Sequence, residues 1–211
     1  MVFNQTSQET KPRRKPRQNR SVMTFEAILD AAAILFAQDG FESTSTTKVA
    51  RLAGVSVGSL YEYFPNKDSL IANLIQRHCE QMLARFTRNF AQARGASLER
   101  VIEAFIDSTH EAYAENYPLQ RVLLAHIGRV SKPHHFKRVS QAIIGMLEHT
   151  LLASQDEIRR PNLRNALFIV ECAVESLHHR ALQFEAQLFS GDLKQELLVM
   201  AVAYLKTPGA E

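Results

Sequence analysis

An all-α fold is predicted by two features of this chain. Apolar residues recur every three or four positions along most of its 211 residues, the period of one face of a helix, and no segment shows the alternation of a half-buried strand. The 45% apolar and 22% charged composition is typical of a globular protein with a substantial core. We expect about nine helices, divided between an N-terminal three-helix domain and a larger C-terminal helical domain.

Residues 1–20 are expected to form a disordered basic arm. The segment has no hydrophobic periodicity, contains Pro12 and Pro16, and carries six cations but no acid between residues 11 and 20, although the whole chain has a net charge of only +3. Such a segment buries too little apolar surface to order by itself. The arm is either a solvated tail or a contact to DNA phosphates or the minor groove.

The first helix is predicted over residues 22–38 and closed by Gly40. Its apolar residues, from Phe25 to Phe36, share one face on which two further short helices can pack. Next, the hydroxyl cluster of residues 44–47 can cap a short helix that ends at Gly54, where glycine accepts a positive φ. Ser56 can cap a second short helix over residues 57–63. The pattern is that of a helix-turn-helix.

The exposed positions of the second short helix are suited to DNA. Val57, Gly58 and Ser59 are small enough to approach base edges, and the hydroxyls of Tyr61 and Tyr63 can bond phosphates. After Pro65 the chain enters a long helix over residues 66–94, capped by Asn66, with Lys67 beside amides that attract an anion.

These motifs, in this order, resemble the DNA-binding signature of the TetR family of transcriptional regulators over about residues 22–75. The match comprises Gly40-Phe41, Thr46-Thr47, Val49-Ala50, Ala53-Gly54-Val55-Ser56, Gly58, Leu60-Tyr61, Tyr63-Phe64 and Asn66-Lys67. The resemblance implies a helix-turn-helix domain over residues 21–67 and a helical effector-binding and dimerisation domain over residues 68–211. It also implies a homodimeric, ligand-responsive repressor that binds a palindromic operator in double-stranded DNA.

Carried over position by position, the resemblance assigns a DNA contact to each matched residue. Backbone contacts fall to Thr46 and Thr47, phosphate contacts to Ser56, Tyr61, Tyr63 and Lys67, and base edges to Val57, Gly58 and Ser59. Val57 departs from the lysine often found there in the family. Valine can touch a thymine methyl group but cannot hydrogen-bond guanine, which puts the family's guanine contact in doubt.

The C-terminal part predicts five more helices. They run from Ser97 to before Pro118, across Leu119–Ile127, from after Pro133 to Leu151, from Pro161 to about Leu188, and from Ser190 or Asp192 to Tyr204. The helix from Pro161 is apolar on more than one face and therefore needs cover on two sides. Either it lies wholly inside one subunit or it forms a four-helix dimer interface with the last helix, as the resemblance implies. The expected interface residues are Phe168, Cys172, Leu177, Leu197, Met200, Ala201 and Tyr204.

The middle helices mix aromatic and polar side chains at core-facing positions. Buried polar groups need partners, so these side chains either satisfy one another or line a cavity for a small hydrophobic or aromatic effector. The candidate effector residues are Phe105, Thr109, His110, Tyr113, His126 and Phe136.

Other functions are less favoured by the sequence. Gly54-Val55-Ser56-Val57-Gly58 matches the serine turn of α/β-hydrolases, but that motif needs a strand before Ser56 and a helix is predicted there. The adjacent pairs His134-His135 and His178-His179 point about 100° apart on a helix and cannot chelate a metal from one face, so we expect neither an enzyme nor a cofactor.

Cys79 and Cys172 have no metal or redox spacing, and no run of 18 apolar residues predicts a membrane span, which favours a cytoplasmic location. The remaining alternative is a sequence-independent architectural DNA-binding protein that uses the basic arm.

Overall fold

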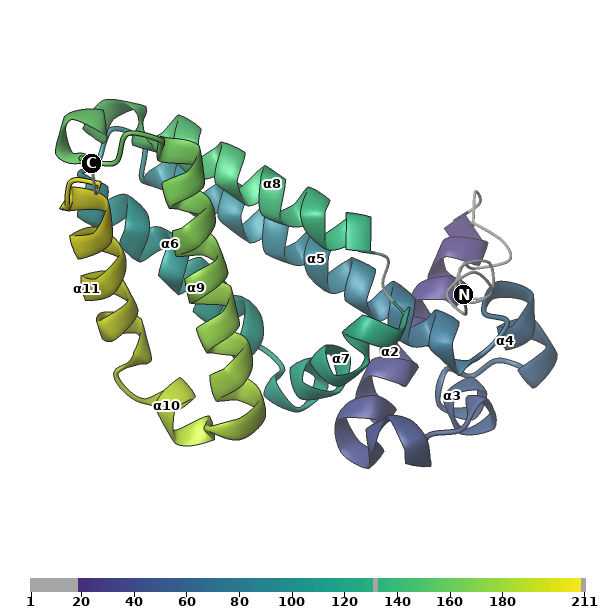
Figure 1. The fold of residues 1–211 in the computed structure, drawn as a ribbon. Helices are drawn as coiled ribbons and strands as arrows, with labels where there is room; N and C mark the ends of the chain where they lie inside the picture. The colour runs from purple at the N-terminus through teal and green to yellow at the C-terminus, as the bar shows by residue number, and fades with distance from the viewer. Residues whose placement is uncertain (1–18, 131–132, 210–211) are drawn as a thin grey trace, which may run out of the picture. The chain divides into compact units, whose positions relative to one another are not determined.

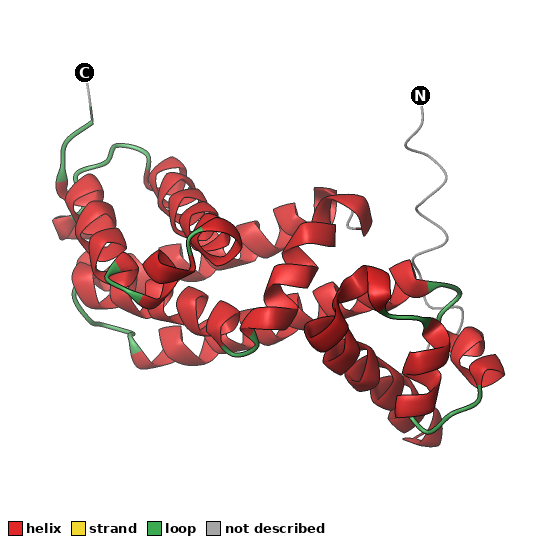
Figure 2. Cartoon of the chain, turned by 90° about the horizontal axis from the view of Figure 1, so that it is seen from below, coloured by secondary structure: helices red, strands yellow, loops and turns green. Residues whose placement is uncertain are grey.

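The described chain is helical throughout (Figures 1 and 2). The computed structural model describes residues 19–130 and 133–209, without the side chains of residues 133–137, 186 and 190. Ten α-helices and one 3₁₀ helix lie within those residues, none of which forms a strand. The predicted all-α fold is confirmed. The expected basic arm lies outside the described residues, apart from Asn19 and Arg20, which begin the first described helix.

Contacts divide the chain into two compact units. The first unit contains the chain up to His78 together with Asn116–Pro133, and the second contains Cys79–Glu115 and His134–Glu211. α5 (Lys67–Gln92) contributes its first half to the first unit and its second half to the second. This division differs from the predicted boundary after residue 67, because α7 (Tyr117–Val130) packs against the first helix of the chain despite its distance in sequence.

The first unit is built on α2 (Asn19–Ser43), which contacts both α3 (Thr46–Leu52) and α7. α4 (Val57–Tyr63) packs on α3. α2 is longer than predicted because a final helical turn follows Gly40, whose φ of 78° lies in the left-handed region where a side chain would be strained. The core of the unit consists of large side chains that are almost fully buried, namely Ile28, Leu29, Phe36, Leu60, Phe64, Leu70 and Ile71.

Among the described residues, α2 is the one helix that meets the length and composition criteria for crossing a membrane. The core helix of a water-soluble protein meets the same criteria. In this structure Ile28, Leu29 and Phe36 of α2 are buried against the other helices of the first unit.

The second unit is built around α6 (Leu98–Ala114), which contacts both α9 (Leu163–Phe184) and α11 (Leu193–Lys206), as Figure 1 shows. α8 (Pro133–Thr150), the 3₁₀ helix η1 (Leu151–Glu157) and the short α10 (Ala186–Ser190) complete it. Ser97 caps α6 as predicted, accepting from the amide of Arg100 at 3.4 Å. The carboxylate of Glu157 in η1 accepts from the amide of Leu98, a contact that sequence periodicity does not reveal.

Two predicted boundaries in this unit are wrong. α9 begins at Leu163 rather than Pro161, because the side chain of Asn162 accepts from the amide of Asn165 at 3.0 Å and proline has no such acceptor. The helix ends at Phe184 rather than near Leu188, since Glu185 leaves the helical region with φ −136° and ψ 60°. Apolar residues continue across this break and conceal it in the sequence.

Candidate functional site

The helix-turn-helix of the first unit is held by short-range caps. Ser45 accepts from the amide of Lys48 at 3.2 Å and begins α3, while Ser56 accepts from the amide of Ser59 at 3.0 Å and begins α4. Gly54 lies between the helices with φ 68°, as predicted. The serine turn of a hydrolase requires a strand before the serine. Here the helix α3 precedes Ser56, and Ser56 caps the next helix.

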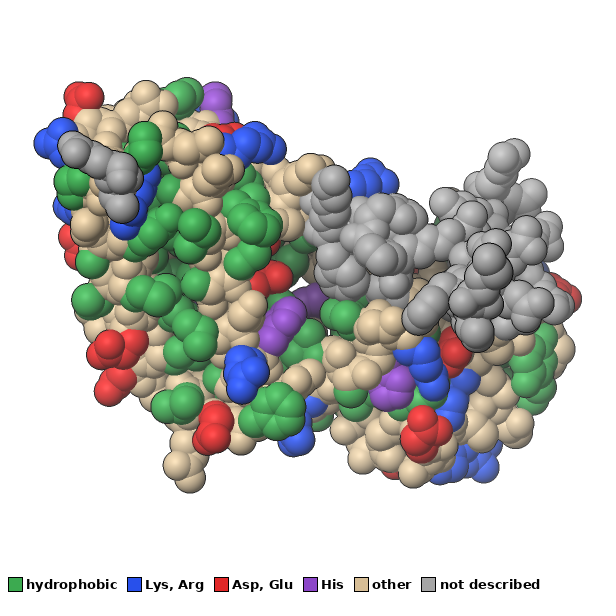
Figure 3. Space-filling model, in the orientation of Figure 1, with side chains coloured by type: hydrophobic (Ala, Val, Ile, Leu, Met, Phe, Trp, Pro, Cys, Tyr) green, Lys and Arg blue, Asp and Glu red, His purple; other side chains and the backbone are tan. Residues whose placement is uncertain are grey.

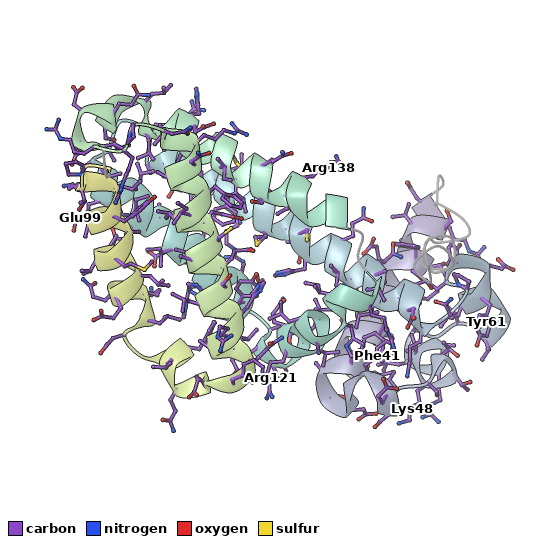
Figure 4. The ribbon with its side chains drawn as sticks, viewed as in Figure 1. Phe41, Lys48, Tyr61, Glu99, Arg121 and Arg138 are labelled. Atoms are coloured by element: carbon purple, nitrogen blue, oxygen red, sulfur yellow. The ribbon has the colours of Figure 1, made fainter. Side chains whose placement is uncertain are left out.

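One face of α3 and α4 is exposed and carries most of the predicted DNA contacts. Val57, Gly58 and Tyr61 are exposed on α4, Thr47 is exposed on α3, and Ser59 is partly exposed. Figure 4 places Tyr61 on α4 and Lys48 on α3. The hydroxyl of Tyr61 lies 3.0 Å from that of Thr46, so one hydrogen bond joins the two short helices.

Tyr63 corrects one expectation. Its side chain is only 7% exposed, and its ring lies edge-on to that of Phe25 with 6.2 Å between centroids. It comes three residues after Leu60, the spacing that brings it onto the same buried face of α4. The expected exposure of Tyr63 is wrong, and the residue supports α4 from within the core.

Lys67 also has intramolecular partners. Its ammonium donates to the carbonyl oxygens of Phe41 at 2.7 Å and Glu42 at 3.2 Å, at the end of α2. A lysine at this position satisfies carbonyls that a helix end leaves without partners. The side chain remains 24% exposed, so its predicted phosphate contact stays a prediction alongside this structural role.

The ring of Phe41 is the centre of a junction within the first unit. It lies 4.3 Å from the ammonium of Lys67, 4.7 Å from the guanidinium of Arg129 and 4.3 Å from the ring of His126. Arg129 is also paired with Asp68. α7 packs on α2 and carries His126 into the first unit, whereas the α6 residues belong to the second, so the effector role of His126 stays a prediction.

A cluster of polar side chains lies between α6 and α9 in the second unit. The hydroxyl of Tyr113 is hydrogen-bonded to Nε2 of His179 and donates to the carboxylate of Glu175 at 3.4 Å. The ring of His178 lies 5.6 Å from that of His110, which stacks on Phe189 at 4.5 Å. The structure therefore brings two predicted effector residues, His110 and Tyr113, to one place.

The other predicted effector residues do not add polar groups to this cluster. Phe105 is a core residue beside Phe86, with 5.7 Å between ring centroids. Thr109 is buried, and its hydroxyl donates to the carbonyl of Phe105 at 3.0 Å. The side chain of Phe136 lies outside the described residues. A small pocket of about 80 Å³ between α6 and α11 is lined by none of the predicted residues.

Burial shifts the pKa values of this cluster. It raises the pKa of Glu175 to about 7, with a further rise from the neighbouring carboxylate of Glu171. It lowers the pKa values of both His178 and His179 to about 4. Glu171 and Glu175 were not among the predicted site residues, although two acids four residues apart within an apolar helix were a visible signal.

An apolar face lies on the outside of α9 and α11, where Figure 3 shows hydrophobic side chains gathered. The exposed residues are Phe168 at 53%, with Ile169, Leu177, Val199 and Met200. Cys172 and Tyr204 are partly exposed, and the guanidinium of Arg160 lies 3.9 Å from the ring centroid of Tyr204. Leu197 and Ala201 are buried in the core of their own subunit, so their expected exposure is wrong. They lie four residues apart on the inner face of α11, opposite Val199.

Comparisons with known proteins cover both units. Residues 28–74 match the family model described as bacterial regulatory proteins, tetR family, and residues 97–205 match that of the tetracyclin repressor-like C-terminal domain. The chain is 31% identical to the HTH-type transcriptional regulator UidR of Escherichia coli K12 over 98 residues, which is 46% of this chain and 49% of UidR. The chain spans about half the length of the curated relatives it matches.

Solved structures share the fold over most of the chain. Salmonella enterica GusR is 24% identical, with a TM-score of 0.62 over 87% of this chain and 96% of GusR. A complex of SmeT with triclosan is 21% identical, with a TM-score of 0.64 over 89% of this chain and 96% of SmeT. At these identities the likeness shows the fold.

Proposed function

This chain belongs to the TetR family of bacterial regulatory proteins, and on that premise we propose that it is a ligand-responsive transcriptional repressor. It binds its operator as a homodimer and releases it when a small effector binds. The observation that carries the proposal is the exposed face of α4, where Val57, Gly58 and Tyr61 project from a helix that Ser56 caps and Leu60 anchors.

On DNA, α4 enters a major groove. Ser59 and Gly58 leave room at base edges, Val57 meets a thymine methyl group, and Tyr61 and Thr47 bond phosphates. Arg51 joins the set, because it is exposed on the last turn of α3, one helical turn after Thr47. Two such heads on a dimer axis read a near-palindrome with half-sites about 34 Å apart or a multiple of that distance.

The outer face of α9 and α11 is the dimer interface of this proposal. Phe168 and Ile169 of α9 and Met200 of α11 are large apolar side chains that are exposed, the kind of surface that a second copy covers. Leu197 and Ala201 instead hold α11 in its own subunit.

The effector acts by binding one conformation of the dimer more tightly than another. A coupling of ~1–3 kcal/mol between ligand and DNA is the usual scale for such a response. α5 is the continuous helix shared by both units, and we place the conformational shift there. The solved structure of SmeT is a complex with triclosan, which makes a small aromatic effector a reasonable first class to screen.

As a DNA-binding regulator the protein acts in the cytoplasm.

Selection of bound sequences from a random DNA library tests the proposal. We expect a palindromic motif, and we expect Val57→Lys to change the preferred base at one position of each half-site while Tyr61→Phe weakens binding evenly across sequences. Equal affinity for selected and random DNA at physiological salt would instead show an architectural protein that uses the basic arm.

A further inference from the structure

Two carboxylates of the second unit have no cation beside them among the side chains that the structure describes. Glu171 is 3% exposed, and Glu175 lies one helical turn further along α9, partly exposed beside Tyr113. Among the side chains that the structure describes, which leave out residues 133–137, 186 and 190, neither carboxylate forms a salt bridge, although eleven other pairs do. Buried carboxylates are normally paired with a cation, because an isolated charge is costly to remove from water.

The histidines beside them do not supply the missing charge. Burial lowers the pKa values of His178 and His179 to about 4, so both are neutral at neutral pH. Among the described side chains, the hydroxyl of Ser140 and the thiol of Cys172 bond Glu171, and both are uncharged. The cluster is therefore negative or protonated, and a bound cation would stabilise its charged form.

His178 adds an independent sign that a ligand binds here. The residue is fully buried, and its Nδ1 donates to the carbonyl of Val174 at 2.8 Å. The opposite ring nitrogen, Nε2, is consequently an acceptor, and it is buried without a hydrogen-bond partner among the described residues. The ring of His178 lies among those of His110, Tyr113 and Phe189, with 5.6, 6.4 and 6.0 Å between centroids.

We propose that the site around Tyr113 binds an organic cation that carries N–H donors, and that this cation is the effector. The acceptors presented to it are the carboxylates of Glu175 and Glu171 and Nε2 of His178. The rings of Tyr113, His110 and Phe189 provide aromatic surface beside those acceptors, which suits the carbon skeleton of an aromatic amine. The identification as effector rests on the proposed function, whereas the binding site does not.

Calorimetric titration of the full-length protein without DNA tests the site. The probes are 2-phenylethylamine, 2-phenylethanol and phenylacetate, which share one ring and differ in charge. We expect the amine to bind at least on the order of tenfold more tightly than the alcohol, with no binding of the anion. Equal affinity for the amine and the alcohol, or no heat from the amine at millimolar concentration, overturns the proposal.

Variants locate the binding. Glu175→Gln keeps the shape and removes the charge, so it should abolish the preference for the amine, and Glu171→Gln should reduce that preference. Glu99→Gln is the matched control, because Glu99 is an exposed acid on α6 (Figure 4) and should leave the preference unchanged. If Glu175→Gln fails to fold, as judged by its helical circular dichroism, Glu171→Gln carries the test. An unchanged preference in a folded Glu175→Gln protein refutes the site.

A proton readout separates charge recognition from packing. The groups facing Glu175 are Glu171, His179, Tyr113 and Cys79, and burial raises the pKa of Glu175 itself to about 7. At about pH 6 amine binding should release a proton, seen as a heat that varies with buffer ionisation enthalpy, and at about pH 8 it should not. Operator binding is measured separately by fluorescence anisotropy. Amine binding without an effect on DNA would refute the effector role alone, and DNA binding without amine binding would refute the site alone.

Discussion

The two units of this protein place their polar side chains differently, although serine or asparagine caps begin helices in both. In the first unit, the helix starts depend on hydrogen bonds between residues three apart, such as Ser45 to Lys48 and Ser56 to Ser59, and the polar side chains of the reading face remain exposed. In the second unit, Tyr113 reaches His179 and Asn89 reaches Ser108, and several polar groups are buried. The exposed polar groups of the first unit suit the proposed contact with DNA, and the buried ones of the second suit the proposed binding of a ligand.

The largest effect is expected from the core of the first unit. Phe64→Ala removes a fully buried ring that stacks on Phe25 at 4.7 Å, and should lower the free energy of unfolding by ~3–5 kcal/mol. Chemical denaturation measures this loss, with the exposed Glu62→Ala as control. We expect the two units to unfold independently, so part of the helical circular dichroism should persist at denaturant concentrations that unfold the first unit of Phe64→Ala. A single transition for the whole protein would contradict that independence.

Glu175 provides a pH test of the second unit. In the folded protein its pKa is about 7, above the ordinary value, so the native state favours protonated Glu175. The stability that this gives is fully present below the ordinary pKa and is lost as the pH rises through about 7. Glu175→Gln should lack this loss and become more stable than the wild type at about pH 8, by ~1–3 kcal/mol. His178 and His179 destabilise both proteins equally as pH falls toward 4, so the difference between the two unfolding curves isolates Glu175. A pH-independent difference would contradict the assignment.

Two glycines within the helix-turn-helix should respond in opposite ways. Gly54→Ala meets no atom within 4 Å but places a side chain at φ 68°, which should cost ~1–2 kcal/mol of stability. Gly58→Ala lies in a helix with only ordinary contact to Ser56, so it should preserve stability or raise it by up to ~1 kcal/mol. The same substitution should nevertheless weaken DNA binding, since a methyl group then faces the base edges. Thermal unfolding measures stability, and fluorescence anisotropy measures DNA affinity. A Gly58→Ala protein that is less stable than the wild type would contradict the prediction.

Lys67→Ala distinguishes a structural role from a DNA contact. Losing the bonds to the carbonyls of Phe41 and Glu42 should cost ~1 kcal/mol of stability. If the ammonium also neutralises a phosphate, the slope of log affinity against log salt should fall by about one. An unchanged slope with reduced stability would assign Lys67 to the structure of the head alone. Arg51→Ala, at an exposed position of the same head, serves as the comparison.

The sequence predicted the first unit well because its signals are local. Gly54 has the positive φ value expected of it, and Ser56 caps the helix it precedes. Residue type did not distinguish Tyr61 from Tyr63, which have the same chemistry. The spacing of three residues from Leu60 indicates that Tyr63 faces inward, where it packs against Phe25.

The second unit was predicted less completely because its features depend on distant partners. The apolar spacing of α11 is the same whether Leu197 faces its own core or a second copy, and the structure places it inside. His126 was grouped with α6 by its residue type, but α7 belongs to the first unit. Glu175 has no motif, and its raised pKa arises from burial that only the fold creates.

The caps of the first unit have a consequence for biosynthesis. Ser45, Ser56 and Asn66 each bond an amide three residues ahead, so these turns can form as soon as the ribosome has released them. Lys194 must instead find Asp107 across 87 residues, after translation is almost finished. The nascent polypeptide can thus form the turns of its helix-turn-helix well before the contact that joins α11 to α6.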